Sequence, residues 1–227
     1  MIYTLIRSKR RTVAIYIRNG DIEVRAPLRM SKREIEQFIT SKEKWILKNI
    51  TQSQKQETKR GDFSLNYGDT VLLMGYSCVI TAKDISVAGK PFWFDEEALY
   101  IKPGLTPDEI KHTCVELYKN VATNILACKT HEFARQMSVE PSDVKVNSAK
   151  ARWGSCSAKK SINYSWRLIM ADEEVVDYVV VHELAHLIEL NHSKRFWAIV
   201  ESVLPDYKDR KKRLRELQQR LSGEDWD

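Results

Sequence analysis

The sequence has little of what would build a disulfide scaffold, a membrane protein or a low-complexity chain. It contains 4 cysteines in 227 residues, none of them in a Cys-x-x-Cys pair, which disfavours zinc ribbons and thioredoxin-type redox chemistry. Unpaired cysteines are typical of a reducing, cytoplasmic compartment. Its 8 glycines and 6 prolines are too few for a collagen-like or disordered chain. We predict no membrane segment and no signal peptide, because long apolar runs are also lacking.

What remains is the composition of an ordinary globular protein. Apolar residues make up 43% of the chain and charged residues 30%, enough to form a sizeable core under a polar surface. The formal net charge is +6, which tolerates an anionic partner without requiring one.

The first part of the chain, residues 1–104, is predicted to be a β-rich subdomain. Alternating apolar residues on both sides of Asn19-Gly20 indicate a hairpin, because a tight turn with positive φ favours that pair. Ser31 and Glu34 form a capping box at the start of one helix, and the polar residues 51–61 resemble a surface linker. Further strands are expected at 63–67, 71–74, 76–81, 92–94 and 99–101. The prediction is a small antiparallel unit with one helix.

The second part, residues 105–227, is predicted to be mostly helical. Thr106, Pro107 and Glu109 have the pattern of a helix start, and this helix should reach about Met137. A short sheet is expected from strands near 144–146, 152–157 and 162–169, and helices near 173–190, 194–204 and 207–222. Strands followed by segregated helices indicate the α+β class.

The strongest chemical signal is a histidine-rich segment near the end of the second part. His182 and His186 are four residues apart on a predicted helix, so both rings project from one face, where they can share a zinc ion. Glu183 follows the first histidine and is placed to act as a general base on a metal-activated water. The pattern therefore predicts a catalytic metal site.

A hydrolytic zinc takes three protein ligands, and His192 is the first candidate for the third. Asn191 tolerates a left-handed, helix-ending conformation, which would turn the chain back toward the metal, and Ser193 would then start the next helix. Glu201 on that helix is the alternative third ligand.

The segment from Arg152 to Ser157 is a second candidate element of the site. As an edge strand it could pair with an extended substrate, with Gly154 permitting close approach and Arg152 binding a carboxylate or phosphate. The alternative is that Arg152 forms a structural ion pair. Cys156 is not expected to act as a nucleophile, and either Asn163 or Tyr164 could reach the oxyanion.

Residues 208–220 are strongly basic, with 7 Lys or Arg against 2 Asp or Glu. The simplest interpretation is a solvated helix face. The alternative is contact with nucleic acid or another polyanion.

Several segments together resemble the YgjP-like metallopeptidase family, which is related to the SprT-like and WLM zinc proteases. They are Arg152–Ser157, Ile162–Leu168, Tyr178–His186, Asn191–Trp197, Pro205-Asp206 and the basic N-terminal run Arg7–Thr12. The resemblance covers nearly the whole chain. It implies a zincin-like domain in the second part, with His182, His186 and His192 as zinc ligands and Glu183 as catalytic base.

The leading hypothesis from sequence is thus a Zn²⁺-dependent hydrolase of the peptidase type, acting on a peptide or protein. One alternative is a metal-dependent nucleotide pyrophosphohydrolase, although no P-loop motif is present. Another is a polyanion-binding module with structural zinc. Nickel, cobalt and copper also suit imidazole ligands, and the sequence predicts no oligomeric state.

Overall fold

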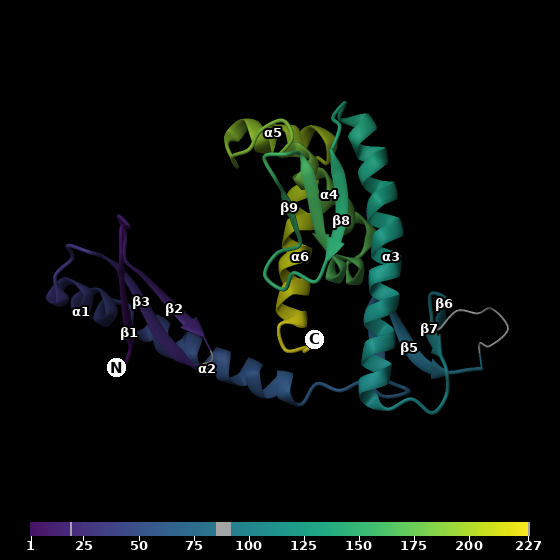
Figure 1. The fold of residues 1–227 in the computed structure, drawn as a ribbon, viewed down its shortest axis with the longest axis horizontal. Helices are drawn as coiled ribbons and strands as arrows, with labels where there is room; N and C mark the ends of the chain where they lie inside the picture. The colour runs from purple at the N-terminus through teal and green to yellow at the C-terminus, as the bar shows by residue number, and fades with distance from the viewer. Residues whose placement is uncertain (19, 85–91, 227) are drawn as a thin grey trace. The chain divides into compact units, whose positions relative to one another are not determined.

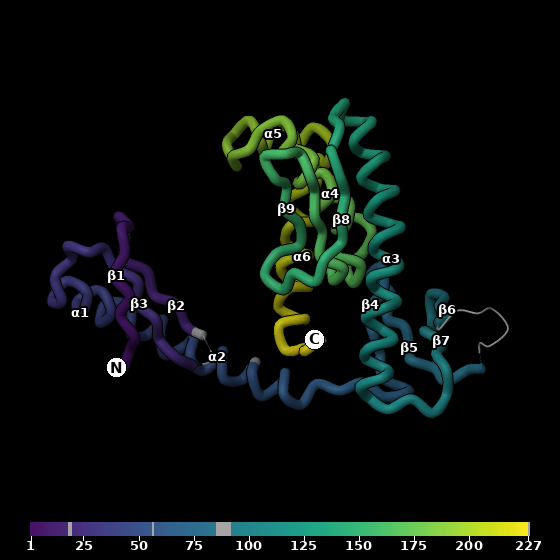
Figure 2. The backbone as a smooth tube through the Cα atoms, in the orientation of Figure 1, coloured from purple at the N-terminus to yellow at the C-terminus, as the bar shows by residue number. Residues whose placement is uncertain are grey.

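The computed structural model describes residues 1–18, 20–84 and 92–226 (Figures 1 and 2). It confirms the α+β class: the strands form three small sheets, and runs of strands alternate with runs of helices along the sequence. Within the described residues, no helix combines the length and apolar character needed to cross a bilayer.

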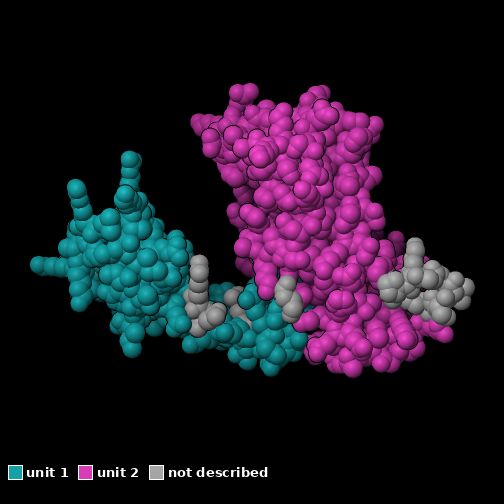
Figure 3. Space-filling model, in the orientation of Figure 1, with its two compact units in different colours: residues 1–63, 221–225, 227 teal, residues 64–220, 226 magenta. Residues whose placement is uncertain are grey.

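The residues form two compact units (Figure 3). Unit 1 holds Met1–Phe63 and Leu221–Asp225, and unit 2 holds Ser64–Arg220 and Trp226. This grouping does not test the expected division into subdomains 1–104 and 105–227, which stays a prediction.

In unit 1, a three-stranded sheet has the order β1-β3-β2. The predicted hairpin forms from β2 (Ala14–Arg18) and β3 (Asp21–Pro27), with Ile17 opposite Ile22. Asn19 lies outside the described residues, but Gly20 has the positive φ of 82° that such a turn requires. The sequence did not predict β1 (Thr4–Ser8), which pairs parallel to β3 and makes the sheet mixed rather than antiparallel.

Two helices cover this sheet, where the sequence predicted one. The capping box of Ser31 and Glu34 starts α1 (Lys32–Ser41) as expected. The chain breaks at Lys42 and continues as α2 (Glu43–Gly61), so residues 51–61 are helical and the prediction of a linker was wrong. These residues are polar, yet they include many Gln, Lys and Glu, which favour helix, and no proline. Buried aliphatic residues of β3, α1 and α2 form the core: Ile22, Val24, Ala26, Ile35, Ile39 and Ile46.

Unit 2 begins with a four-stranded sheet of order β4-β5-β7-β6. Its strands are β4 (Thr70–Leu73), β5 (Tyr76–Ala82), β6 (Phe92–Phe94) and β7 (Ala98–Ile101). β5 and β7 pair in parallel, so this sheet is also mixed, and the strand expected at 63–67 does not form.

The turn between β4 and β5 packs against the helix that carries the histidines. Gly75 has a φ of 83°, and a Cβ there would lie 2.8 Å from Cβ of Asp172. Asp172 is the N-cap of α4 (Glu173–Ala185) and accepts a hydrogen bond from the Val175 N–H. Glycine is therefore required both by backbone conformation and by the close approach.

The longest helix, α3 (Pro107–Gln136), begins at the predicted capping box of Thr106 and Glu109. A third mixed sheet follows, of order β8-β10-β9, from β8 (Asp143–Asn147), β9 (Gly154–Cys156) and β10 (Ser161–Ser165). β9 is an edge strand, paired antiparallel with β10. The strand expected at 162–169 ends at Ser165, and a fully buried 3-10 helix, Trp166–Met170, takes its place.

Three helices complete unit 2: α4, α5 (Lys194–Val203) and α6 (Tyr207–Leu221). α4 packs against both α3 and β9. It ends at Ala185, earlier than the predicted residue 190. A tail residue, Trp226, completes an aromatic cluster in which it makes edge contacts with Tyr118 and Trp166, whose rings stack on each other at 5.5 Å.

Candidate metal centre

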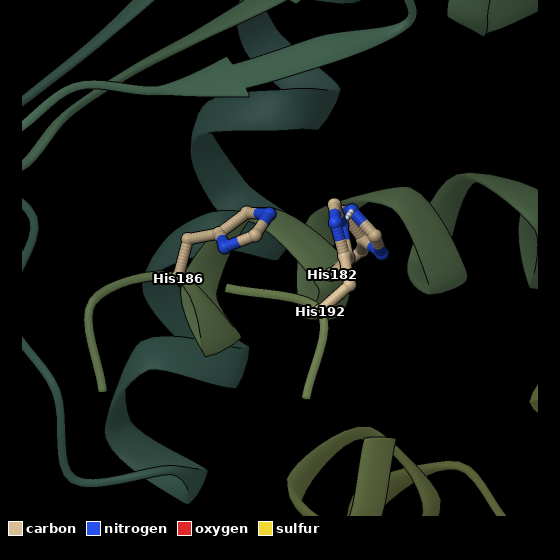
Figure 4. Close-up of side chains that lie close together, drawn as sticks. All are labelled: His182, His186 and His192. Carbon is tan, nitrogen blue, oxygen red and sulfur yellow. Dashed lines mark hydrogen bonds between the residues drawn. The ribbon is translucent and has the colours of Figure 1, made fainter. Parts of the chain in front are cut away.

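Three histidines meet where α4 ends. His182 lies in the last turn of α4, His186 is the C-cap residue, and His192 lies in the following loop. The rings point toward one another (Figure 4), and Nε2 of His192 is 3.0 Å from Nε2 of His182. One nitrogen from each of the three residues lies within 4.8 Å of the others.

This donor set fits a divalent ion. Two nitrogens bound to a tetrahedral Zn²⁺ at its usual bond length would be about 3.3 Å apart, close to the distance between His182 and His192. Three imidazoles also leave a coordination position free for solvent or substrate. The geometry therefore supports a metal-binding role for the trio.

The loop after α4 directs the third histidine differently from the prediction. Asn191 is not among the described residues with positive φ, so the expected left-handed conformation was wrong. The turn is closed instead by the N–H of Ser193, which donates to the Asn191 carbonyl at 2.7 Å. Ser193 also caps α5 by accepting from the Phe196 N–H, as predicted, so the two hydrogen bonds fix the path of the chain beside His192.

A hydrogen bond orients the second histidine. Nδ1 of His186 lies 3.2 Å from the Glu189 carbonyl oxygen. With the ring in the tautomer that donates this bond, Nε2 keeps its lone pair for a cation.

Burial favours the neutral form of His182 and His192, the form of an imidazole that binds metals. It lowers the pKa of His182 to about 3, with further lowering by the neighbouring histidines and the positive charge of Lys211. The pKa of His192 is also lowered, first by burial and then by the charges of His186 and Lys211.

Aromatic side chains of α5 form one wall of the centre. The Phe196 ring is fully buried and lies 4.6 to 4.9 Å from the three imidazole rings. Trp197 stacks on His192 at 5.6 Å. Phe196 thus belongs to the hydrophobic core as well as to the wall of the centre.

Glu183 is buried beside the histidines, with 5% of its surface exposed. Burial raises the pKa of its carboxyl to about 7, partly opposed by the positive charge of Arg152. Its Oε2 has no hydrogen-bond partner among the described residues. A buried, unpartnered carboxyl group whose pKa is near neutral has the properties of a proton acceptor in a site.

The edge strand β9 faces this carboxyl group. A Cβ atom added at Gly154 would lie only 2.6 to 2.8 Å from atoms of the Glu183 side chain. Gly154 therefore allows close approach of the Glu183 side chain, and the expected approach of a substrate backbone stays a prediction. The exposed Arg152 is near enough for its charge to act on Glu183.

The remaining sequence candidates do not gather at the histidines. Glu201 pairs with Lys208 at 3.6 Å and is not in the metal-binding group of the described residues. Tyr164 is fully buried, with its hydroxyl 3.1 Å from Oγ1 of Thr130. Burial and the charge of Glu183 raise the pKa of Cys156, which disfavours a thiolate nucleophile.

The sequence did not indicate that a basic residue of α6 lies beside the centre. Nζ of Lys211 is 4.3 Å from the centroid of the Trp197 ring, which stacks on His192. The only sequence signal is the four-residue spacing of Tyr207, Lys211 and Arg215, which places them on one helix face.

Comparisons with known proteins agree with this description. The model of the family described as "YgjP-like, metallopeptidase domain" matches residues 11–217. No curated protein sequence matches the chain.

Two solved structures are similar to part of this chain. The metallopeptidase zymogen abylysin of Pyrococcus abyssi has 25% identity and a TM-score of 0.39, over 41% of this chain and 95% of its own. The metallopeptidase zymogen jannalysin of Methanocaldococcus jannaschii has 20% identity and a TM-score of 0.36, over the same shares of 41% and 95%.

Proposed function

The chain belongs to the YgjP-like metallopeptidase family, and from that premise we propose that it is a zinc-dependent peptidase. His182, His186 and His192 hold the metal and Glu183 is the general base. The observation that carries the proposal is the convergence of three imidazole nitrogens within 4.8 Å beside a buried carboxyl group. Family membership and the histidine trio imply a metal ion, and the all-imidazole donor set favours zinc.

His182, His186 and His192 would hold the zinc ion, which when bound would supply Lewis-acid chemistry: polarisation of the scissile carbonyl and a lowered pKa, about 7, for water. Glu183 accepts the proton from the attacking water. Its raised pKa suits this role, because a base that titrates near the working pH both takes and returns a proton efficiently. Glu183 then passes the proton to the leaving amine nitrogen, and the peptide bond breaks.

The edge strand β9 is suited to hold the substrate. Its free edge offers backbone N–H and C=O groups to an extended peptide, the mode of recognition called β-augmentation. Because Gly154 of β9 packs directly against Glu183, a peptide paired with this strand would lie next to the base. We assign Gly154 and Arg152 to the substrate-binding side of the centre.

The proposal is tested with purified, zinc-loaded protein and its Glu183→Gln variant. We expect the wild type to cleave unfolded proteins or peptides, and the variant to keep its zinc but lose turnover by at least about 100-fold, as for removal of a general base. Equal turnover by the two proteins would refute the role of Glu183.

The same preparation is offered nucleoside triphosphates. Release of phosphate or pyrophosphate without peptide cleavage would identify a phosphoanhydride hydrolase instead. Failure to act on either class, with zinc firmly bound, would favour a structural metal.

A further inference from the structure

We propose that Lys211 and Arg215 on α6 form a carboxylate-recognition element beside the metal centre. The ligand is a carboxylate group of the polypeptide substrate, supplied by an acidic side chain or by a free C-terminus next to the scissile bond. This inference rests on the proposed peptidase function and names the substrate class that the site selects.

The position of Lys211 is fixed by aromatic contacts. Its Nζ lies 4.3 Å from the centroid of the Trp197 ring, a distance typical of a cation–π interaction. That ring lies 5.6 Å from the His192 ring and 5.8 Å from the His182 ring. Tyr207, one turn before Lys211, also stacks on Trp197 at 5.4 Å. The ammonium group is therefore one aromatic ring away from two of the three histidines.

Arg215 lies one helical turn after Lys211 on α6, on the same face of the helix. Both cations thus add positive potential on the α6 side of the centre, where an anionic group of a substrate would be stabilised.

Lys211 and Arg215, like Arg220 near the end of α6, have no ion-pair partner among the described residues. Four neighbours do have acidic partners: Lys208 with Glu201, Arg210 with Asp206, Lys212 with Glu216, and Arg213 with Asp172. Four of the 7 basic residues in the stretch 208–220 are therefore paired with acidic groups, whereas Lys211 and Arg215 remain available to an anionic ligand.

The environment of Lys211 is not that of a solvated surface residue. It is half-buried, and its pKa is lowered first by burial and then by the charge of Arg215. A half-buried ammonium group beside another cation is destabilising until an anion joins it. The arrangement therefore favours binding of a ligand that brings a negative charge, and a carboxylate is the anion that a peptide substrate carries.

The test measures peptide binding by the zinc-loaded Glu183→Gln protein, which cannot turn the peptide over. Four fluorescent peptides share one sequence and differ in two ways: a Glu or Gln beside the scissile position, and a free or amidated C-terminus. We expect at least one carboxylate to tighten binding, and Lys211→Met to weaken binding of that peptide by about tenfold, a typical effect of losing a charge-assisted contact.

Matched variants separate recognition from general effects. Lys212→Met removes the same charge from the adjacent, exposed residue of α6 and is expected to leave all four affinities unchanged. Lys211→Arg keeps the charge and should keep the preference. The zinc content of each protein is measured, and it should not differ, because Lys211 is not a ligand.

The pattern across the four peptides names the source of the carboxylate. If Lys211→Met weakens binding only of peptides with a free C-terminus, the element recognises a terminal carboxylate. If it weakens binding only of the Glu peptides, the element recognises a side-chain carboxylate. Equal weakening of all four peptides, or equal weakening by Lys212→Met, would overturn the proposal, as would Lys211-dependent binding of ATP with no carboxylate preference among peptides. Absence of cleavage by the wild type would instead count against the peptidase function, while carboxylate-dependent binding would still support this inference.

Discussion

The backbone of Gly154 lies directly against the side chain of Glu183. A Cβ at Gly154 would be 2.6 Å from Oε1 of Glu183, 2.7 Å from its Cγ and 2.8 Å from its Cδ. Glycine is needed here for space rather than for conformation, because Gly154 is not among the residues with positive φ. The contact joins the edge strand β9 to the helix that carries the proposed base.

Replacing Gly154 with Ala should displace the Glu183 carboxyl group. We expect unfolding free energy to fall by about 1 to 3 kcal/mol, the usual range for overpacking, and peptidase turnover to fall with it. Urea unfolding and a peptide cleavage assay measure the two effects.

A double-mutant cycle isolates the contact. In a Glu183→Ala background the space is vacated, so Gly154→Ala should then cost much less stability. The same cost in both backgrounds would show that the strand tolerates the methyl group poorly for another reason.

The stability of the metal-free protein should depend on pH through Glu183. Its pKa in the folded protein, about 7, is above the ordinary value of 4.5. The unfolded chain therefore loses the proton first, and stability falls as pH rises from about 4.5 to about 7. Glu183→Gln removes this effect, so between pH 5 and pH 7.5 the variant should gain about 2 kcal/mol relative to the wild type.

Urea unfolding of both metal-free proteins at the two pH values provides the measurement. The lowered pKa of His182 makes stability rise with pH, the opposite of the Glu183 effect. It is present in both proteins, so it cancels when the two free energies of unfolding are compared. A difference that does not change with pH would mean that the carboxyl group titrates normally.

Loss of one histidine should weaken metal binding selectively. We expect His192→Ala to reduce zinc affinity by at least about 100-fold, since loss of even an outer-shell partner of a ligand costs 10- to 100-fold. His112, exposed on α3, provides the matched control. Competition with a chelator measures affinity, and equal affinities in the two variants would exclude His192 as a ligand.

Zinc should also stabilise the folded protein. At a free concentration of 100 times its dissociation constant, the ion adds about 2.7 kcal/mol to the free energy of unfolding. We expect thermal unfolding to shift upward in the wild type and hardly at all in a variant with all three histidines replaced by Ala. A similar shift in that variant would locate the zinc elsewhere.

The penultimate residue should contribute strongly to stability. Trp226 is 6% exposed and contacts the rings of Tyr118 and Trp166. Trp226→Ala should cost about 3 to 5 kcal/mol, as for other buried aromatic residues. Trp45, which is 48% exposed on α2, provides a control whose replacement by Ala should cost far less. Comparable losses in the two variants would contradict the assigned packing.

Local signals in the sequence correctly predicted the main elements of the second part. Capping residues such as Thr106, Asp172 and Ser193 start helices where they were expected, because an N-cap satisfies backbone donors within one turn of chain. The spacing of His182 and His186 likewise follows from helix geometry alone, and the motif indicated the metal chemistry. The α+β class also follows from the order of the elements.

Strand partners and packed neighbours were decided only in the tertiary structure. Nothing in the residues around Thr4 indicated that β1 would pair parallel to β3, because parallel partners are not joined by a local turn. Helical propensity joined the polar residues 51–61 to α2 without an apolar stripe to reveal it. A 3-10 helix of five buried residues replaced the end of a predicted strand, because apolar alternation does not reveal where a buried strand stops.

The same division holds at the metal centre. The sequence determined which side chains we propose as metal ligands and as the base, since that choice depends on residue type and on spacing along one helix. Only the folded chain decided that Gly154 lies against Glu183, and that Lys211 of α6 sits one ring away from His192. These contacts join segments 29 and 19 residues apart in the sequence, and packing between separate elements, unlike helix periodicity, leaves no repeating pattern along the chain.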